Sequence, residues 1–235
     1  MSKFEPMKYR HIFFDLDHTL WDFKTNSLAT LQELFVTYKL SRVFDDFDSF
    51  HEKYEKHNLR LWNLYRRGKV TRQALNFDRF YLPFSEAGFD DPVIAGQFGK
   101  DYLAISPTKT KLMPYTLELL NYLKAKYTLH IITNGFREVQ ERKLEMCGIR
   151  PYFNKVFISD LIGVQKPNIR FFEYAVKSTN ARKKESLVVG DSLEVDIAGA
   201  QNYGLDHVFF NSKQISHEKK VMLEISSLKQ LFDFL

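Results

Sequence analysis

The chain has 235 residues, 44% of them hydrophobic, which is enough to bury a substantial core and excludes a disordered or fibrous protein. The formal net charge of +5 comes from Lys and Arg residues scattered along the chain, so it favours a small anionic partner over nucleic acid. The single cysteine, Cys147, excludes an intramolecular disulfide framework and favours a cytoplasmic location. Residues 1–10 are polar and no apolar run reaches about 18 residues, so we expect neither a signal peptide nor a membrane span.

The first predicted strand is the apolar run Ile12–Phe14, and it ends in two acidic residues, Asp15 and Asp17, with Thr19 close behind. Because strand side chains alternate, the two carboxylates would share one side, at the strand end where α/β sheets bind ligands. Two carboxylates this close repel each other, and a cation that prefers oxygen ligands, such as Mg²⁺, relieves the repulsion. The pattern therefore indicates a metal or ligand site.

Residues 22–107 change character, because they are rich in aromatic and charged residues and their apolar positions recur with helical spacing. We predict an inserted all-helical cap domain here, whose surface closes over the end of the first strand. Gly68 and Gly88 are expected to stop helices and Thr71 to cap one. The predicted helices are Asn26–Tyr38, Phe47–Arg67, Thr71–Ala87 and Pro92–Ile105.

From Pro114 onward, helical and strand patterns alternate, which predicts an α/β fold with a doubly wound, Rossmann-like parallel sheet. We assign residues 1–21 and 108–235 to this core domain. The expected elements are a helix Pro114–Lys126, a strand Tyr127–Gly135, a helix to Cys147, a strand Val156–Ile158, a helix Asn168–Ser178, a strand Ser186–Asp191, a helix Val195–Tyr203, a strand His207–Phe210, a loop Ser212–Lys220 and a terminal helix Ser227–Leu235.

Polar side chains follow three of these strands, and a lysine stands between the second and third groups. In a doubly wound sheet such strand ends converge on one crevice, so residues far apart in sequence form one site. Each group alone is more often a turn, a surface cap or a solvated loop, and only their combination favours a catalytic site. The groups are Asp15, Asp17 and Thr19; Thr133 and Asn134; Lys166 with Pro167; and Asp191, Ser192 and Asp196.

These segments resemble the four motifs of the haloacid dehalogenase-like (HAD-like) phosphohydrolases, in family order and with the helical cap inserted after the first. The resemblance spans nearly the whole chain. Two cap segments are further similar to the branch that contains YjjG-type pyrimidine 5′-nucleotidases. The motifs stand here as Asp15–Leu20, Thr133–Gly135, Lys166–Pro167 and Gly190–Asp196, and the cap segments as Trp21–Phe23 and Leu61–Thr71.

The resemblance implies that Asp15 is a nucleophile that forms an aspartyl-phosphate, and that Asp17 is the general acid and base. A dehalogenase needs neither that acid nor the metal, so Asp17 favours phosphoryl transfer over carbon–halogen cleavage. Thr133, the Asn134 backbone and Lys166 would hold the phosphoryl oxygens.

The resemblance also implies a Mg²⁺ cofactor, held by the Asp15 carboxylate, the Asp17 backbone carbonyl and the Asp191 carboxylate. Asp196 would either contact a metal-bound water or brace the loop and Lys166.

The implied function is a Mg²⁺-dependent phosphatase acting on a small phosphorylated metabolite, with a nucleoside 5′-monophosphate preferred. Trp62 and Arg66 are candidate cap contacts to the nucleotide, although a Trp at helical spacing is more often part of a core. Tyr115 stands where relatives usually have Gly. This difference puts the substrate specificity in doubt, but it leaves the four motifs and the chemistry they imply intact.

Three alternatives stay open: a sugar-phosphate or other small-metabolite phosphatase or phosphotransferase on the same scaffold, a binding protein without turnover, and a nucleic-acid-binding protein. No motif residue is missing, which argues against a binding protein without turnover. No pattern of a groove-reading module supports nucleic-acid binding. The sequence does not indicate the oligomeric state.

Overall fold

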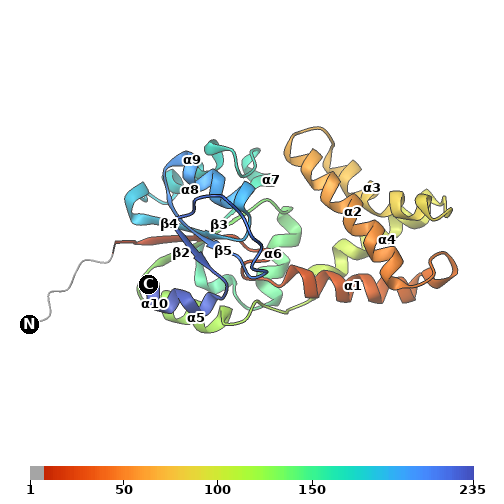
Figure 1. Ribbon diagram of the computed structural model, residues 1–235, viewed down its shortest axis with the longest axis horizontal. Coiled ribbons are helices and arrows are strands. Elements are labelled where there is room, and N and C mark those ends of the chain that lie inside the picture. Colours follow the sequence, from red (N-terminus) through yellow and green to blue (C-terminus); the bar gives the residue numbers. More distant parts are fainter. Residues whose placement is uncertain (1–7) are drawn as a thin grey trace, which may run out of the picture. The chain divides into compact units, whose positions relative to one another are not determined.

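The computed structural model describes residues 8–235, so the expectation about the polar N-terminal stretch lies largely outside the described residues (Figure 1). The chain divides into two compact units. One contains the chain up to Phe23 and from Thr110 to Leu235, and the other is Lys24–Lys109. The first is an α/β unit and the second is all-helical.

The α/β unit is built on a six-stranded parallel sheet with the strand order β3-β2-β1-β4-β5-β6. This is the doubly wound order, and its direction reverses between β1 and β4, next to the first strand of the chain. Phe14 of β1 lies opposite Ile131 of β2 and Val189 of β4, so the ends of these three strands lie within two residues of one another. The strands are β1 His11–Phe14, β2 Thr128–Thr133, β3 Phe153–Ile158, β4 Ser186–Gly190, β5 Asp206–Phe210 and β6 Leu223–Ile225.

Helices cover both faces of the sheet, as Figure 1 shows with α8 and α9 on one side and α5 and α10 on the other. Alternating side chains of β1 explain why both faces are apolar: Ile12 and Phe14 pack on the α5 side and Phe13 on the α8 side. The helices of this unit are α5 Thr116–Leu123, α6 Arg137–Met146, α7 Ser159–Ile162, α8 Ile169–Ser178, α9 Ala198–Tyr203 and α10 Leu231–Phe234.

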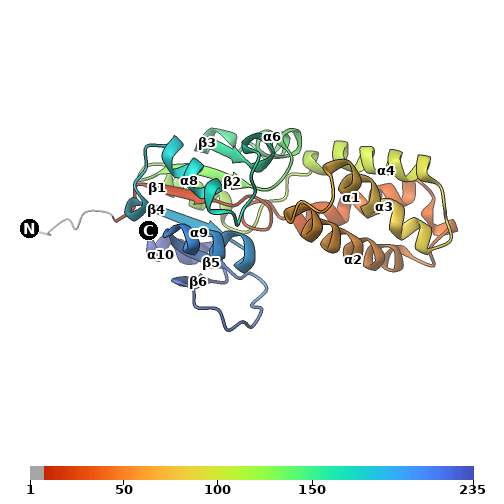
Figure 2. The same cartoon turned by 90° about the horizontal axis from the view of Figure 1, so that it is seen from above.

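The helical unit consists mainly of the four helices labelled α1 to α4 in Figure 2. Aromatic rings from all four pack together in a core of their own. Phe50, Phe80, Phe84 and Phe98 are fully buried at its centre. The predicted cap at Thr71 is confirmed, since its hydroxyl accepts the Ala74 N–H at 3.1 Å. The helices are α1 Phe23–Thr37, α2 Phe47–Arg66, α3 Arg72–Glu86 and α4 Pro92–Ile105.

The two chain segments that lead into and out of the helical unit are joined within the α/β unit. Trp21 and Leu112 form an antiparallel bridge, the Asp22 N–H donates to the Lys111 carbonyl at 3.0 Å, and the Met113 N–H donates to the Leu20 carbonyl at 2.9 Å. The insertion therefore starts and ends at adjacent points of the α/β unit.

Several predicted boundaries were wrong at the ends of elements. Pro114 does not open a helix, because Tyr115 has a positive φ of 69° and α5 begins only at Thr116. The predicted terminal helix is a 3₁₀ turn followed by the short α10, and β6 was not predicted at all. The helix predicted from Val195 begins instead as a π-turn over Leu193–Ile197. None of the helices in the described residues 8–235 is long and apolar enough to cross a bilayer.

Candidate active site

Asp15 lies at the switch point of the sheet, directly after β1, and is buried. Its backbone N–H continues the ladder by donating to the Val189 carbonyl at 2.9 Å, which fixes the Asp15 backbone at the strand end. Within the same loop, the Thr19 hydroxyl donates to Asp15 Oδ2 at 3.2 Å. The loop after β1 therefore folds back so that Thr19 contacts the Asp15 carboxyl group.

Lys166 is the centre of the site, with a side chain that is only 1% exposed. Its ammonium lies 2.6 Å from Asp15 Oδ1, 2.6 Å from Asp196 Oδ1 and 3.0 Å from the Ile132 carbonyl, so all three N–H donors are used. Asn134 fixes the lysine backbone, accepting from its N–H and donating to its carbonyl, both at 2.9 Å. The second and third predicted motifs are therefore joined through a side-chain amide.

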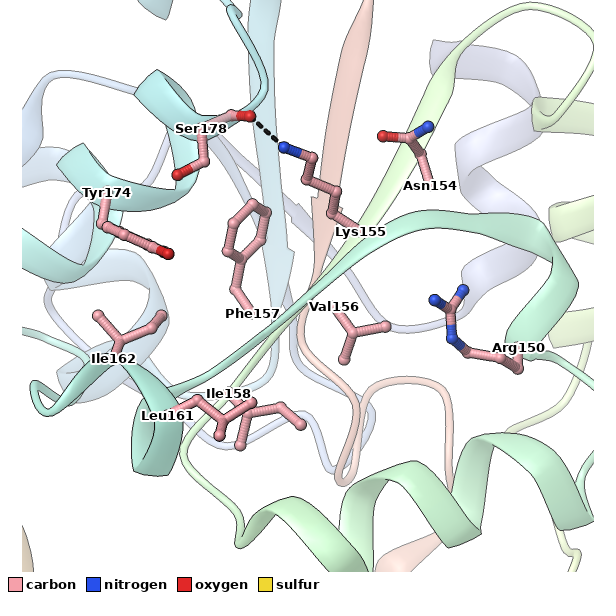
Figure 3. Close-up of a pocket in the computed structure, with 10 residues that line it drawn as sticks. All are labelled: Arg150, Asn154, Lys155, Val156, Phe157, Ile158, Leu161, Ile162, Tyr174 and Ser178. Carbon is pink, nitrogen blue, oxygen red and sulfur yellow. Dashed lines mark hydrogen bonds between the residues drawn. The ribbon is translucent and has the colours of Figure 1, made fainter.

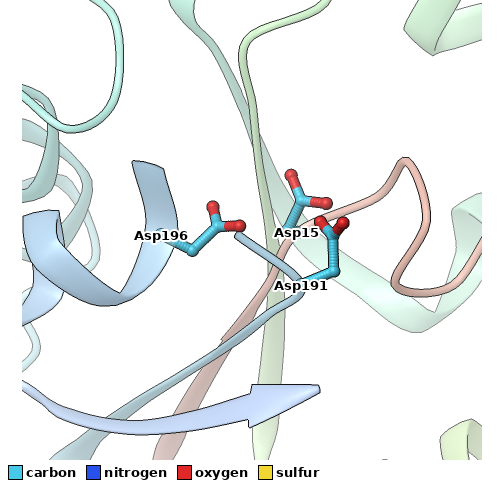
Figure 4. Close-up of side chains that lie close together, drawn as sticks. All are labelled: Asp15, Asp191 and Asp196. Carbon is cyan, nitrogen blue, oxygen red and sulfur yellow. The ribbon is translucent and has the colours of Figure 1, made fainter. Parts of the chain in front are cut away.

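The structure brings three carboxyl groups together, as Figure 4 shows: Asp15, Asp191 and Asp196 offer oxygens within 4.8 Å of one another. Burial raises the pKa of Asp15 to about 7, although Lys166 pulls it back down. Burial, together with the charge of Asp15, also raises the pKa of Asp191 well above its ordinary value. For Lys166, burial alone would lower the pKa, but Asp15 and Asp196 outweigh it and raise the pKa.

This donor set fits a divalent cation that prefers oxygen ligands. Three ionised carboxylates beside one ammonium leave two negative charges in a buried site, and burial, with the neighbouring carboxylates, raises the pKa values of Asp15 and Asp191. The Asp196 carboxylate is already engaged on both oxygens, by Lys166 and by the Ser192 N–H at 3.1 Å. Asp15 is engaged in the same way, by Lys166 and by the Thr19 hydroxyl, so within residues 8–235 Asp191 has the carboxylate of the cluster most open to a cation.

Asp17 has partners that the sequence did not indicate. Lys143 lies 2.5 Å from its Oδ1, and the Gln140 amide donates to its Oδ2 at 2.8 Å and to Thr133 Oγ1 at 2.6 Å. Both residues belong to α6, whose buried face is formed largely by polar side chains. Gly135 makes room for this contact, because a Cβ there would come within 2.4 Å of the Gln140 side chain.

The two predicted cap contacts belong to the helical unit. Trp62 and Arg66 are half-buried near the end of α2, where the Trp62 ring meets Tyr65 edge-on at 5.8 Å and the Arg66 guanidinium donates to Asn63. Burial and the neighbouring Arg67 lower the pKa of Arg66. Their contact with a substrate stays a prediction.

A pocket of about 410 Å³ lies elsewhere in the α/β unit, along the edge strand β3 (Figure 3). Phe157, Ile162 and Tyr174 line it, and the Lys155 ammonium donates to the Ser178 carbonyl at its rim. No predicted site residue contributes to this pocket.

The fold and site together define an α/β enzyme with an acidic, metal-binding type of site at the switch point of its sheet and a helical insertion after the first strand. The model of the haloacid dehalogenase-like hydrolases matches residues 9–204, and the chain belongs to this family.

Individual relatives indicate which kind of hydrolase the chain resembles. The chain is 34% identical to the pyrimidine 5′-nucleotidase YjjG of Escherichia coli, over 88% of each chain, and 31% identical to the pyrimidine 5′-nucleotidase PynA of Streptococcus pneumoniae, over 97% of this chain and 96% of that one. It is 29% identical to the glyceraldehyde 3-phosphate phosphatase of Methanothermobacter thermautotrophicus, over 94% and 98% of the two chains. These relatives identify the chain as a HAD-like phosphatase.

A solved structure agrees with this assignment. The HAD-hydrolase YfnB of Bacillus subtilis, solved with magnesium bound, superposes with a TM-score of 0.87 at 27% identity, covering 97% of this chain and 98% of that one.

Proposed function

We propose that the protein is a Mg²⁺-dependent phosphomonoester hydrolase that works through an aspartyl-phosphate, with nucleoside 5′-monophosphates as its substrates. The observation that carries the proposal is the buried Asp15 carboxylate, held by Lys166 at 2.6 Å and followed two residues later by a second acid. A fixed, water-shielded carboxylate beside an ammonium suits attack on phosphorus. We place this activity in the cytoplasm, where a free cysteine such as Cys147 stays reduced.

In the first step, an Asp15 oxygen forms a bond to phosphorus while the bond from phosphorus to the leaving oxygen breaks. The Asp17 carboxyl group gives its proton to that oxygen, and the alcohol leaves. In the second step, Asp17 takes a proton from water, the water oxygen attacks phosphorus, and the acyl-phosphate bond breaks. Inorganic phosphate leaves and the Asp15 carboxylate is restored.

Thr133, the Asn134 backbone and Lys166 are the groups we assign to the phosphoryl oxygens. Lys166 is held by its neighbours, so its charge is preorganised and needs no rearrangement as negative charge develops. Held by Asp15, Asp191 and the Asp17 backbone carbonyl, Mg²⁺ would supply further positive charge at the phosphoryl group. Asp196 would brace Lys166 and the Ser192 loop.

The choice of nucleotides rests on the two pyrimidine 5′-nucleotidases among the relatives. Trp62 and Arg66 are the cap residues we assign to substrate recognition, through ring stacking and an anionic group. A sugar phosphate is the second candidate, favoured by the glyceraldehyde 3-phosphate phosphatase that also matches nearly the full chain. Values of kcat/KM for nucleotides and sugar phosphates, measured side by side, decide between them.

Phosphate release by purified protein tests the chemistry. Asp15→Asn is expected to lose at least about 10³-fold in kcat, because the amide is a poor nucleophile. The matched control Asp233→Asn, at an exposed position near the C-terminus, is expected to keep wild-type activity. EDTA is expected to abolish release, and added Mg²⁺ to restore it. Undiminished turnover in Asp15→Asn would refute the assignment of the nucleophile.

A further inference from the structure

Helix α6 presents polar side chains where a buried helix face is ordinarily apolar. The Gln140 side chain is fully buried and Lys143 is nearly so, although both lie beside the apolar Leu144 on the inward face. Burying an amide and an ammonium is unfavourable unless their hydrogen bonds are satisfied, so their partners should explain why they are there. Those partners are Asp17, the proposed acid of the reaction, and Thr133, a proposed phosphate ligand.

Both oxygens of the Asp17 carboxylate are bound by this helix. Lys143 lies 2.5 Å from Oδ1 and the Gln140 amide nitrogen lies 2.8 Å from Oδ2. The ammonium is itself held over the Trp21 ring, 4.1 Å from its centre. A carboxyl group with a donor on each oxygen cannot rotate without breaking one of the two bonds, so its direction is set by α6.

Gln140 also sets the direction of the Thr133 hydroxyl. Its amide nitrogen donates a second hydrogen bond, to Thr133 Oγ1 at 2.6 Å, and the Gly135 N–H donates to the same oxygen at 3.2 Å. A hydroxyl has two acceptor sites, and both are now occupied. Its own proton is therefore left to be donated to another group, which is what an anionic phosphoryl oxygen requires.

The orientation of the amide follows from the chemistry of Asp17. A carboxylate accepts hydrogen bonds only, so the nitrogen of Gln140, and not its oxygen, must face Asp17. The Gln140 Oε1 atom is then left buried without a partner among the described residues. A glycine at position 135 is what lets Gln140 lie this close, since a Cβ there would come within 2.4 Å of the amide carbon.

We propose that Gln140 and Lys143 are positioning residues for the phosphatase reaction. Lys143 and Gln140 aim the Asp17 carboxyl group at the leaving oxygen and later at the attacking water, and Gln140 turns the Thr133 hydroxyl into a donor for the phosphoryl group. This inference rests on the proposed function and extends it to a helix outside the four motifs.

The test compares two substrates that differ in their need for an acid. The alkoxide of a nucleoside 5′-monophosphate must be protonated as it leaves, whereas p-nitrophenolate leaves readily without a proton. Lys143→Met is expected to slow formation of the aspartyl-phosphate, measured in the first turnover, about 100-fold with the nucleotide and less than about 5-fold with p-nitrophenyl phosphate. The later hydrolysis of the aspartyl-phosphate is common to both substrates and should slow equally. Lys143→Arg, which restores a cation, is expected to recover part of the loss. Arg142→Met, at an exposed basic position on the same helix, should change neither rate.

Gln140→Leu is expected to lower activity on both substrates and to weaken the binding of inorganic phosphate about 10-fold, measured by calorimetry with Mg²⁺ present. Melting temperatures of all variants control for folding. Equal losses in the first-turnover rate on both substrates in Lys143→Met, or unchanged phosphate binding in Gln140→Leu, would overturn the proposal. If the wild-type protein hydrolyses neither substrate, the proposed function itself is wrong, and phosphate binding still tests the role of Gln140.

Discussion

At the scale of single residues, Tyr115 is the clearest case of a side chain at odds with its backbone. It has a φ of 69°, in the left-handed region, just before α5, and its ring is largely exposed beside Lys229. A non-glycine residue there costs about 1–2 kcal/mol, whereas glycine costs little apart from its greater freedom in the unfolded chain. Glycine would adopt this backbone conformation without the steric cost that Tyr115 pays.

Tyr115→Gly is therefore expected to stabilise the protein by roughly 0.5–1 kcal/mol, seen as a higher melting temperature. Tyr115→Ala is the matched control, because it removes the ring but keeps the Cβ. It should show no such gain, and equal stabilisation by Ala would mean that the ring, not the backbone, is responsible.

His130 makes the stability of the protein sensitive to acid. The ring is buried in β2, stacked on Phe13, with Nε2 3.1 Å from His11 Nδ1 and with Nδ1 lacking a partner among the described residues. Burial lowers its pKa to about 3. Because the unfolded chain takes up a proton near pH 6.5 and the folded protein does not, stability is fully present above that pH and falls as the pH is lowered.

The loss from this group at pH 5.5 is about 1.4 kcal/mol relative to neutral pH. His130→Leu is expected to flatten the decline in unfolding free energy between pH 7.5 and 5.5 by about this amount, measured by urea unfolding. Titrating groups that do not contact His130 are shared by both proteins and cancel in the comparison, which leaves His11 as the contacting neighbour, among the described residues, that the substitution also affects. Parallel pH profiles would show that His130 is not the group responsible.

At the scale of elements, α4 carries two glycines in different surroundings. A Cβ on Gly96 would meet only the Phe77 ring at 3.8 Å, an ordinary contact, whereas on Gly99 it would lie 3.1 Å from the Asn76 carbonyl of α3. Gly99 therefore sets the close approach of α3 and α4, and Gly96 merely weakens its helix.

Gly96→Ala is expected to raise stability by about 0.5–1 kcal/mol through helix propensity. Gly99→Ala should gain nothing and should be at least about 1 kcal/mol less stable than Gly96→Ala, because the carbonyl cannot move without α3. Thermal unfolding of the two variants side by side checks this, and equal stability would show that the helices are not tightly packed at Gly99.

Some of the helices and strands that form the site could be predicted from the sequence, and others could not. The strands before Asp15, Thr133 and Asp191 are apolar runs ending in polar residues, and parallel sheets bring such ends together, so the grouping of these residues was predictable. The short β6 was not, since the alternation of Leu223, Glu224 and Ile225 extends over only three residues. Nor was the role of α6, because a buried glutamine has the same sequence signal as an exposed one.

At the scale of the whole molecule, the helical unit is an insertion whose ends are tied together by the α/β unit. The Trp21–Leu112 bridge and the bond from the Asp22 N–H to the Lys111 carbonyl lie outside Lys24–Lys109. Replacing Lys24–Lys109 with a short Gly-Ser linker should therefore leave an α/β unit that unfolds cooperatively, since the loop that closes the gap is short.

Circular dichroism and thermal unfolding of this shortened protein check the expectation, and the fragment 24–109 alone should be helical because it has its own aromatic core. If the shortened protein shows no cooperative transition, the two units depend on each other for folding.

The central position of β1 has a consequence for synthesis on the ribosome. This strand is made first, yet both of its neighbours, β2 from Thr128 and β4 from Ser186, are made much later. The helical unit ends at Lys109, so its helices are complete while Ile12–Phe14 still lacks a sheet. We therefore expect the nascent chain to fold its insertion before the unit that surrounds it, with the apolar first strand left unpaired in the interval.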